Sequence, residues 1–205
     1  GDLKKGKVSL TDESAFEVGK NIATTEGQVV FRNDLFELIQ YTPLTETVYE
    51  RPYLMVPPCI NKYYILDLQP DNSVVRYMVE QGHTVFLVSW KNPDASMSKV
   101  TWDDYVGDGV IKAIEVVREI GSTDQINVLG FCVGGTLTTN ALAVLAARKK
   151  DYVASLTLLT TLLDFTDTGI LDVFIDEGMV KLRESTIGGE GGHFGMMSGL
   201  DLGNT

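Results

Sequence analysis

Short apolar runs along the chain alternate with segments whose apolar residues recur at helical spacing. The runs are rich in β-branched and aromatic residues, which is typical of buried strands. They lie at residues 53–56, 83–90, 126–131 and 153–160. The predicted helices between and after them lie at 71–81, 101–121 and 134–148. This alternation predicts an α/β fold with a parallel sheet covered by helices on both faces.

Local signals mark the ends of these elements. Asn33-Asp34 separates two apolar segments, 28–32 and 35–41, which predicts a β-hairpin before the parallel strands. Thr101 and Asp104 have the spacing of a capping box, and Gly82 and Gly121 follow helical patterns as C-caps. The helix 101–121 is expected to bury one face formed by Val106, Val110, Ile114, Val117 and Ile120.

The pattern changes after Leu163, where a polar loop at 164–169 precedes a helical segment at 171–184 and a Gly-rich stretch at 188–192. The run 153–160 is apolar on both faces, as a central strand is, and an edge strand of this kind would expose unpaired backbone. We therefore expect further strands, absent from this sequence, and interpret the 205 residues as a fragment. Its expected parts are a lead-in segment 1–27, the first part of the core 28–163, and the start of a cap 164–205.

Composition narrows the classes of function. The net charge of −11 and the absence of a Lys/Arg stripe argue against nucleic acid binding. Two cysteines do not form a disulfide framework, and a reducing cytosol suits them. The first residues lack the apolar core of a signal peptide. The most apolar stretch, 128–147, contains Cys132, three Thr and Asn140, so it divides better into a strand and a helix than into a membrane span.

The motif with chemical content is Gly-Phe-Cys-Val-Gly-Gly at 130–135, placed after a predicted strand and before a predicted helix. This is the setting of a nucleophile elbow, with Cys132 in place of the usual serine. Gly130 and Gly134 are needed because strand and helix approach closely at such a turn. The positive end of the helix favours a thiolate, and the N–H of Val133 is predicted to face a developing oxyanion.

A second oxyanion donor is expected from the loop after the first parallel strand. Pro57 and Pro58 have no N–H there, so the first available donors are Cys59 and Ile60, and we expect one of these. The alternative for Cys132 is a buried core cysteine in a Gly-rich turn, since free cysteine is among the most buried residue types. The Cys59 side chain has no elbow around it and is interpreted as structural or as part of a pocket wall.

A cysteine nucleophile needs a base and a group that orients the base. In enzymes with a nucleophile elbow, the base follows the nucleophile in the chain, whereas His83 precedes Cys132. His83 is therefore interpreted as a half-buried residue with satisfied hydrogen bonds. His193 follows Cys132 and could mimic the usual order with an aspartate, but the acid and base normally follow two later strands. The aspartates in question are Asp164, Asp167 and Asp172. We therefore expect the true Asp and His to lie beyond Thr205.

Several segments together resemble the polyhydroxyalkanoate synthases, most closely the class I, short-chain type. The resemblance extends over about 11–184, and no role is transferred to 188–205, which departs from the pattern. The segments are 55–68 (MVPPCINKYYILDL), 82–93 (GHTVFLVSWKNP), 101–105 (TWDDY), 129–136 (LGFCVGGT) and 162–169 (LLDFTDTG).

The resemblance implies an α/β-hydrolase-like core with an inserted cap that begins near Asp164 and with C-terminal strands that this chain lacks. It implies acyl transfer from (R)-3-hydroxyacyl-CoA, with 3-hydroxybutyryl-CoA as the expected substrate, onto a growing polyester. Cys132 matches the family's covalent acyl carrier, while the family's catalytic His and Asp match no residue here. It further implies homodimers at the surface of cytoplasmic polyester granules, with no metal and no cofactor, because the CoA thioester is the substrate.

Three hypotheses follow from these patterns. The first is a truncated catalytic domain of such a synthase, inactive by itself because it lacks the base and flanking strands. The second is a Cys-dependent hydrolase or thioesterase of the same fold, which would pass the acyl group to water. The third is an inactive interaction module that binds the granule or a partner synthase.

Overall fold

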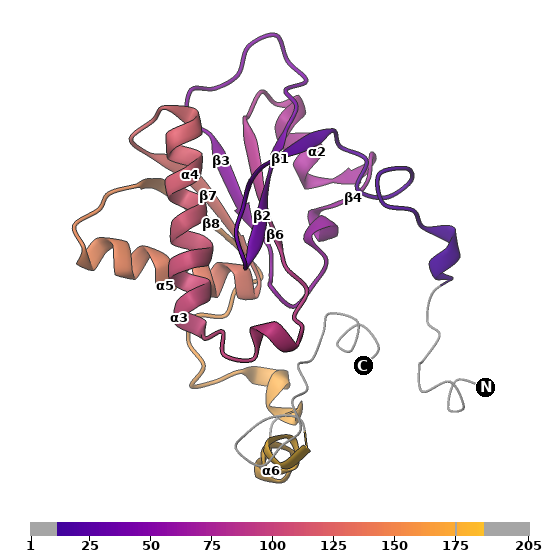
Figure 1. Ribbon diagram of the computed structural model, residues 1–205, viewed down its shortest axis with the longest axis vertical. Helices are drawn as coiled ribbons and strands as arrows, with labels where there is room; N and C mark the ends of the chain where they lie inside the picture. Colours follow the sequence, from indigo (N-terminus) through magenta and orange to yellow (C-terminus); the bar gives the residue numbers. More distant parts are fainter. Residues whose placement is uncertain (1–11, 175, 187–205) are drawn as a thin grey trace.

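The computed structural model describes residues 12–174 and 176–186 and contains a six-stranded sheet in the order β1-β2-β6-β3-β7-β8 (Figure 1). Strands β3, β6, β7 and β8 are parallel, and the β1–β2 hairpin joins β6 in antiparallel fashion. The strands are β1 (Gly27–Arg32), β2 (Phe36–Tyr41), β3 (Tyr53–Val56), β6 (Val85–Trp90), β7 (Ile126–Phe131) and β8 (Val153–Leu159). The predicted mostly parallel α/β sheet with its hairpin is therefore confirmed.

Helices cover both faces of this sheet. The helices that cover it are α2 (Val74–Glu80), α4 (Lys112–Gly121) and α5 (Val133–Ala147), and a further helix, α6 (Glu177–Thr186), follows later in the chain. The short elements are η1 (Glu13–Ala15), η2 (Tyr63–Leu66), η3 (Ala95–Met97), α3 (Trp102–Asp104), η4 (Tyr105–Ile111) and η5 (Gly169–Phe174), with a small hairpin of β4 (Asp67–Gln69) and β5 (Asn72–Ser73). In Figure 1, α4 and α5 lie on one side of the sheet and α2 lies on the other.

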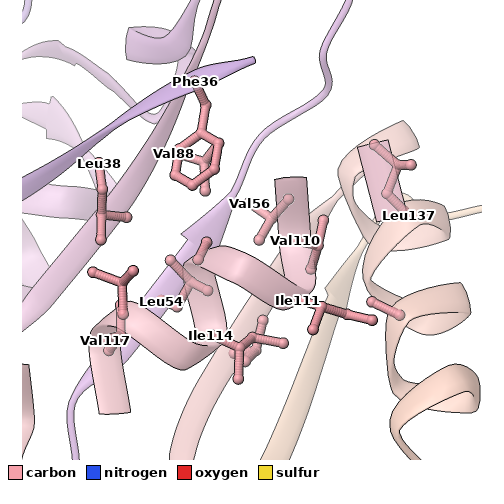
Figure 2. Close-up of a cluster of buried hydrophobic side chains, with 14 of the residues drawn as sticks. Phe36, Leu38, Leu54, Val56, Val88, Val110, Ile111, Ile114, Val117 and Leu137 are labelled. Atoms are coloured by element: carbon pink, nitrogen blue, oxygen red, sulfur yellow. The ribbon is translucent and has the colours of Figure 1, made fainter. Parts of the chain in front are cut away.

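The alternation of side chains along β3 separates two hydrophobic clusters. Leu54 and Val56 pack with residues of η4, α4 and α5, as Figure 2 shows for Val110, Ile114 and Leu137. Met55, between them, belongs to the cluster on the opposite face, together with residues of β6 and α2. Successive residues of a strand point to opposite faces, so one short apolar strand contributes to both cores. This explains why the central runs are apolar at every position.

The helix predicted over 101–121 has a different internal geometry. Its capping box is confirmed, because the Thr101 and Asp104 side chains each accept the other residue's backbone N–H. After α3, however, the chain forms the π-helix η4 before the regular α4. A Cβ at Gly109 would lie 2.9 Å from the Trp90 ring, so this segment packs directly against the end of β6.

One residue expected in the buried face of this helix is exposed. Ile120 is 41% exposed, while Ile114 and Val117 are fully buried. The prediction fails because the last turn of α4 passes the ends of the strands, where Gly121 contacts Pro52, the residue before β3. The π-helix adds Ile111 to the buried set, which the simple periodicity did not indicate.

The helix predicted over 71–81 is shorter than expected. Residues 72–73 form β5, and α2 begins at Val74 with Ser73 as its N-cap, whose hydroxyl accepts the N–H of Arg76 at 2.9 Å. The same hydroxyl donates to Asp67 Oδ1 at 2.6 Å, and Thr25 donates to that oxygen at the same distance. The buried Asp67 carboxylate thus joins the end of the lead-in segment to the N-terminus of α2.

Strand β8 lies at one end of the sheet order in the part of the chain that the structure describes. None of its residues is fully buried, although its leucines would suit a central strand. The expectation that further strands pair with it stays a prediction, as do the three proposed parts of the chain. The Gly-rich stretch 188–192 lies outside the described residues.

The first turn of α5 contacts the carboxyl end of β3 through Gly134. A Cβ at this position would lie 2.1 Å from the Val56 carbonyl oxygen and 2.7 Å from that of Pro57. Both neighbours are backbone atoms of a central strand and its following loop, so they cannot move aside as a flexible side chain can. Only a residue without Cβ allows helix and strand to meet here.

We predict that Gly134→Ala lowers the free energy of unfolding by about 3 kcal/mol or more, because the added methyl group forces α5 away from β3. Gly107→Ala is the matched control, since a Cβ at Gly107 has no neighbour within 4 Å. Its stability should change by no more than about 1 kcal/mol. Urea unfolding of both variants checks the prediction, and equal effects would contradict it.

Candidate active site

Cys132 occupies the turn between β7 and α5 with a strained backbone. Its φ of 53° and ψ of −125° are unusual for a residue with a Cβ, and such conformations cost roughly 1–3 kcal/mol. The Cys132 N–H donates to Leu159 O at 2.9 Å, and its carbonyl accepts the N–H groups of Gly135 at 2.9 Å and Thr136 at 3.3 Å. The strand-to-helix turn predicted from the sequence is therefore present, and hydrogen bonds from β8 and α5 hold it.

Gly130 allows the turn to close. A Cβ at Gly130 would lie 2.4 Å from the Cα of Gly135 in the first turn of α5. The backbone of β7 therefore touches the backbone of the helix that follows Cys132. Cys132 lies between Gly130 and Gly135, where the chain turns from the strand into the helix. Its side chain is half-buried.

The N-terminus of α5 begins immediately after the sulfur-bearing residue. Val133 is the first residue of the helix, and the first N–H groups of a helix have no acceptor within it. The Cys132 side chain accepts no capping hydrogen bond from these groups. The positive end of the helix attracts negative charge at this point.

Three threonines of α5 contribute contacts that sequence reasoning missed. Thr138 is fully buried and donates to Gly134 O at 2.7 Å, and Thr139 donates to Gly135 O at 2.9 Å. Thr136 donates to Leu162 O at 3.0 Å, which connects the helix to the loop after β8. The Thr-rich first half of the helix could have indicated the bonds of Thr138 and Thr139, because threonine hydroxyls in helices often bond carbonyls four residues earlier.

The 57–62 loop, which follows β3, lies at the same edge of the sheet as Cys132. Val56 at the end of β3 is in register with Gly130 in the parallel neighbour β7. Asn61 N donates to Pro58 O at 3.3 Å, which places Cys59 and Ile60 at the centre of a turn. The structure therefore brings both predicted second donors to the edge where Cys132 lies, and it does not choose between them.

The two cysteines have different surroundings. Burial raises the pKa of the Cys59 thiol, opposed in part by its own backbone N–H. Cys59 packs against the larger hydrophobic cluster. Burial raises the pKa of Tyr105, and the electrostatic effect of the nearby Cys59 acts in the same direction. These contacts support the interpretation of the Cys59 side chain as a structural or wall residue that stays protonated near neutral pH.

His83 lies at the opposite end of the sheet from Cys132. It precedes β6, whereas Cys132 follows the parallel β7, so about 20 Å of strand separates the two ends. Its ring lies 4.9 Å from that of Tyr49 and 5.4 Å from that of Tyr53.

The expectation that His83 is fully satisfied is wrong for one atom. Its buried Nδ1 has no hydrogen-bond partner within the described part of the chain. The physical reason is its surroundings, because the aromatic rings on either side offer surface rather than acceptors or donors.

The candidate aspartates after β8 are engaged in their own loop. Asp164 accepts the Thr166 N–H at 3.0 Å and its hydroxyl at 2.7 Å, and these bonds lower the pKa of the Asp164 carboxyl. Asp167 accepts the Gly169 N–H at 2.9 Å, and Asp172 accepts the Thr168 hydroxyl. All three are exposed, and His193 lies outside the described residues. Among residues 12–174 and 176–186, no three His, Cys, Asp or Glu side chains gather into a metal-binding group.

Comparison with known families identifies two overlapping matches. Residues 1–78 match the family described as "Poly-beta-hydroxybutyrate polymerase (PhaC) N-terminus", and residues 54–194 match the family described as "alpha/beta hydrolase fold". Among solved structures, the HSL-homolog EstE7 from a metagenome library aligns with a TM-score of 0.54 and 16% identity. That alignment covers 86% of this chain and 60% of the other, and it shows the fold alone.

Curated relatives give a closer match. The poly(3-hydroxyalkanoate) polymerase subunit PhaC of Cupriavidus necator is 67% identical over 205 residues, which is 100% of this chain and 35% of that protein. The poly(3-hydroxyalkanoate) polymerase of Methylorubrum extorquens is 47% identical over 194 residues, 93% of this chain and 32% of that protein. The chain thus spans about a third of the length of these relatives. With an α/β-hydrolase fold and this identity over its whole length, the chain belongs to the poly(3-hydroxyalkanoate) polymerase (PhaC) family.

Proposed function

We propose that this chain carries the nucleophile of an acyltransferase that polymerises (R)-3-hydroxyacyl-CoA, with 3-hydroxybutyryl-CoA as the expected substrate, into polyhydroxyalkanoate. The observation that carries the proposal is the strained Cys132 at the N-terminus of α5 in a chain of this family. The names of the curated relatives describe them as poly(3-hydroxyalkanoate) polymerases, which supports the same reaction here.

In the proposed first step, the Cys132 sulfur attacks the carbonyl carbon of the hydroxyacyl-CoA thioester. A new carbon–sulfur bond forms, the bond to the CoA sulfur breaks, and CoA leaves as a thiol with the proton that Cys132 gave up. A thioester is exchanged for a thioester, so the step needs no other source of energy. The strained turn and the helix N-terminus support this role because they place the sulfur where the positive end of the helix attracts negative charge.

In the proposed second step, the hydroxyl at the end of a hydroxyacyl chain attacks the acyl group on Cys132. The new ester bond lengthens the chain by one unit, and the Cys132 thiol is regenerated with the proton of that hydroxyl. Exclusion of water from the site would separate such a polymerase from a thioesterase of the same fold.

Two backbone N–H groups are proposed to stabilise the oxyanion of the first step. One is that of Val133, which is free of an intrahelical acceptor. The other belongs to Cys59 or Ile60 in the turn of the 57–62 loop. Their origin after neighbouring parallel strands supports this pairing, because both segments then leave the sheet at the same edge.

The base and the aspartate of the reaction are proposed to come from sequence beyond this chain. His83 lies at the wrong end of the sheet, and the aspartates after β8 bind their own loop. The isolated chain is accordingly proposed to be inactive, and activity experiments need a longer polymerase that contains it.

Granule binding and homodimer formation in a cytoplasmic setting remain proposals. Several large apolar side chains after β8 are exposed, and a polyester or a second subunit would remove such groups from water. They include Leu163, Phe165, Ile170 and Val173, which are 50%, 62%, 86% and 73% exposed. Within the described residues, no helix is long and apolar enough to cross a membrane.

The nucleophile assignment predicts the effect of removing the sulfur. In a polymerase containing this segment, Cys132→Ala should lower CoA release and polymer formation by roughly 10³-fold or more. Mass spectrometry of the Cys59→Ala variant, incubated with 3-hydroxybutyryl-CoA, should still find the acyl group on the peptide that contains Cys132. Full activity of Cys132→Ala would falsify the assignment and favour an inactive interaction module.

The choice between polymerase and thioesterase rests on the product. Incubation of the longer protein with 3-hydroxybutyryl-CoA should release CoA together with insoluble polyester, because the acyl group passes to a chain-end hydroxyl. Chromatography of the soluble fraction measures the alternative. Free 3-hydroxybutyrate in amounts equal to the CoA released, with no polymer, would identify a Cys-dependent hydrolase instead.

The environment of Cys59 predicts a pH dependence that can be measured in the Cys132→Ala background. Burial raises the pKa of the Cys59 thiol, so its thiolate, the reactive form, should appear only above the pH at which a free cysteine ionises. The rate of iodoacetamide labelling against pH should therefore have its midpoint above that of N-acetylcysteine. Unfolding in urea should restore the free-cysteine profile, whereas a midpoint at or below that of N-acetylcysteine would contradict the prediction.

A further inference from the structure

We infer that Trp90 is a positioning residue for the oxyanion site, acting through the hydrogen bond from its indole N–H to the carbonyl of Pro57. The inference rests on the proposed function, because the 57–62 loop matters to catalysis only if it supplies an oxyanion donor. The indole N–H would thus have a role separate from the packing of the Trp90 ring.

The hydrogen bond connects two segments far apart in the sequence. Trp90 is the last residue of β6, and its Nε1 donates to Pro57 O at 2.8 Å in a buried contact. Pro57 is the first residue after β3, which pairs with β6 on one side and with β7 on the other. The bond thus runs from the strand on one side of β3 to the loop that leaves β3.

The same carbonyl group also contacts the elbow. A Cβ at Gly134 would lie 2.7 Å from both the carbon and the oxygen of the Pro57 carbonyl. The Pro57 peptide group is therefore held between the Trp90 indole on one side and the first turn of α5 on the other. Any rotation of this group changes the position of the 57–62 loop relative to Cys132 and Val133.

The sequence of the loop makes this one carbonyl important. Pro58 has no N–H, and the two proline rings restrict the backbone dihedrals on either side of the peptide bond between them. The next groups in the chain are the N–H groups of Cys59 and Ile60, in the turn closed by Asn61. Fixing the plane of the Pro57 carbonyl therefore fixes the starting direction of the turn that carries the proposed second donor.

Trp90 is itself held from several directions. Its ring lies 6.0 Å from Phe36 of β2 in an edge arrangement and 5.4 Å from Tyr105 of η4. Gly109, also in η4, leaves so little room that a Cβ there would lie 2.9 Å from the ring. Trp90 is 8% exposed. A donor held this firmly places its acceptor before substrate arrives, which is what an oxyanion site requires.

A purely structural role would need only the indole ring. A Trp that merely fills the core contributes buried area and ring contacts, and these do not depend on the N–H group. The experiment must therefore remove the N–H while the shape of the ring is kept. The benzothiophene analogue of tryptophan meets this condition, since sulfur replaces the N–H in a ring of nearly the same shape.

The test compares three forms of a longer polymerase that contains this segment: the benzothiophene analogue at position 90, Trp90→Phe, and Trp102→Phe. The chain has two tryptophans, and Trp102, 43% exposed at the start of α3, is the matched control. We expect the analogue to lower kcat for 3-hydroxybutyryl-CoA about tenfold, with KM within about twofold and the urea midpoint nearly unchanged. Trp90→Phe should lower kcat at least as much, and Trp102→Phe should retain the parent values.

The outcomes separate this inference from the proposed function. An analogue with the parent kcat, while Cys132→Ala is inactive, would overturn the role of Trp90 and leave the nucleophile in place. A kcat that falls only in Trp90→Phe, and in proportion to its loss of stability, would overturn that role as well. Activity of Cys132→Ala at the parent level would instead refute the proposed function, whatever the Trp90 variants do.

Discussion

The contact between the first turn of α5 and the carboxyl ends of β3 and β7 is the constraint on which the site depends. Backbone meets backbone at Gly134 against Val56 and Pro57, and at Gly130 against Gly135. The chain must reverse between these two contacts within one residue, and that residue is Cys132 with its positive φ. The strain at Cys132 is therefore a consequence of tight packing around it, and it places the sulfur-bearing side chain where the helix begins.

Hydrogen bonds and packing from several neighbouring elements stabilise this contact. Leu159 at the end of β8 accepts the Cys132 N–H, and Thr136 connects α5 to the loop beyond β8. On the other side, Trp90 and the first turn of α5 enclose the carbonyl of Pro57, and the π-helix η4 packs against the Trp90 ring. A π-helix is less favourable than a regular helix, and such segments recur at functional sites. Here η4 brings Gly109 against Trp90, so its geometry and the position of the 57–62 loop are connected through one indole ring.

The two thiols illustrate how environment assigns chemistry to one residue type. Cys59 lies against the hydrophobic cluster, and burial raises the pKa of its thiol. Cys132 precedes α5, whose first N–H groups have no acceptor within the helix, and a helix N-terminus attracts negative charge. Both lie at one edge of the sheet, yet the proposed roles belong to the backbone of Cys59 or Ile60 and to the side chain of Cys132. Desolvation dominates the surroundings of the Cys59 sulfur, whereas the Cys132 sulfur lies at a helix terminus.

The sequence by itself determined the order of strands and helices, the hairpin, the capping box at Thr101 and the turn at Cys132, because these depend on local periodicity and local stereochemistry. It also carried the family resemblance that the comparisons bear out. Tertiary structure alone decided the π-helix, the exposure of Ile120 and the bond between Trp90 and Pro57, 33 residues apart. It also decided that His83 Nδ1 is buried without a partner among the described residues. These features depend on which strands become neighbours and where each helix passes the end of the sheet. A local sequence pattern does not specify which distant segments become neighbours, so these features are determined only by the packing of the whole chain.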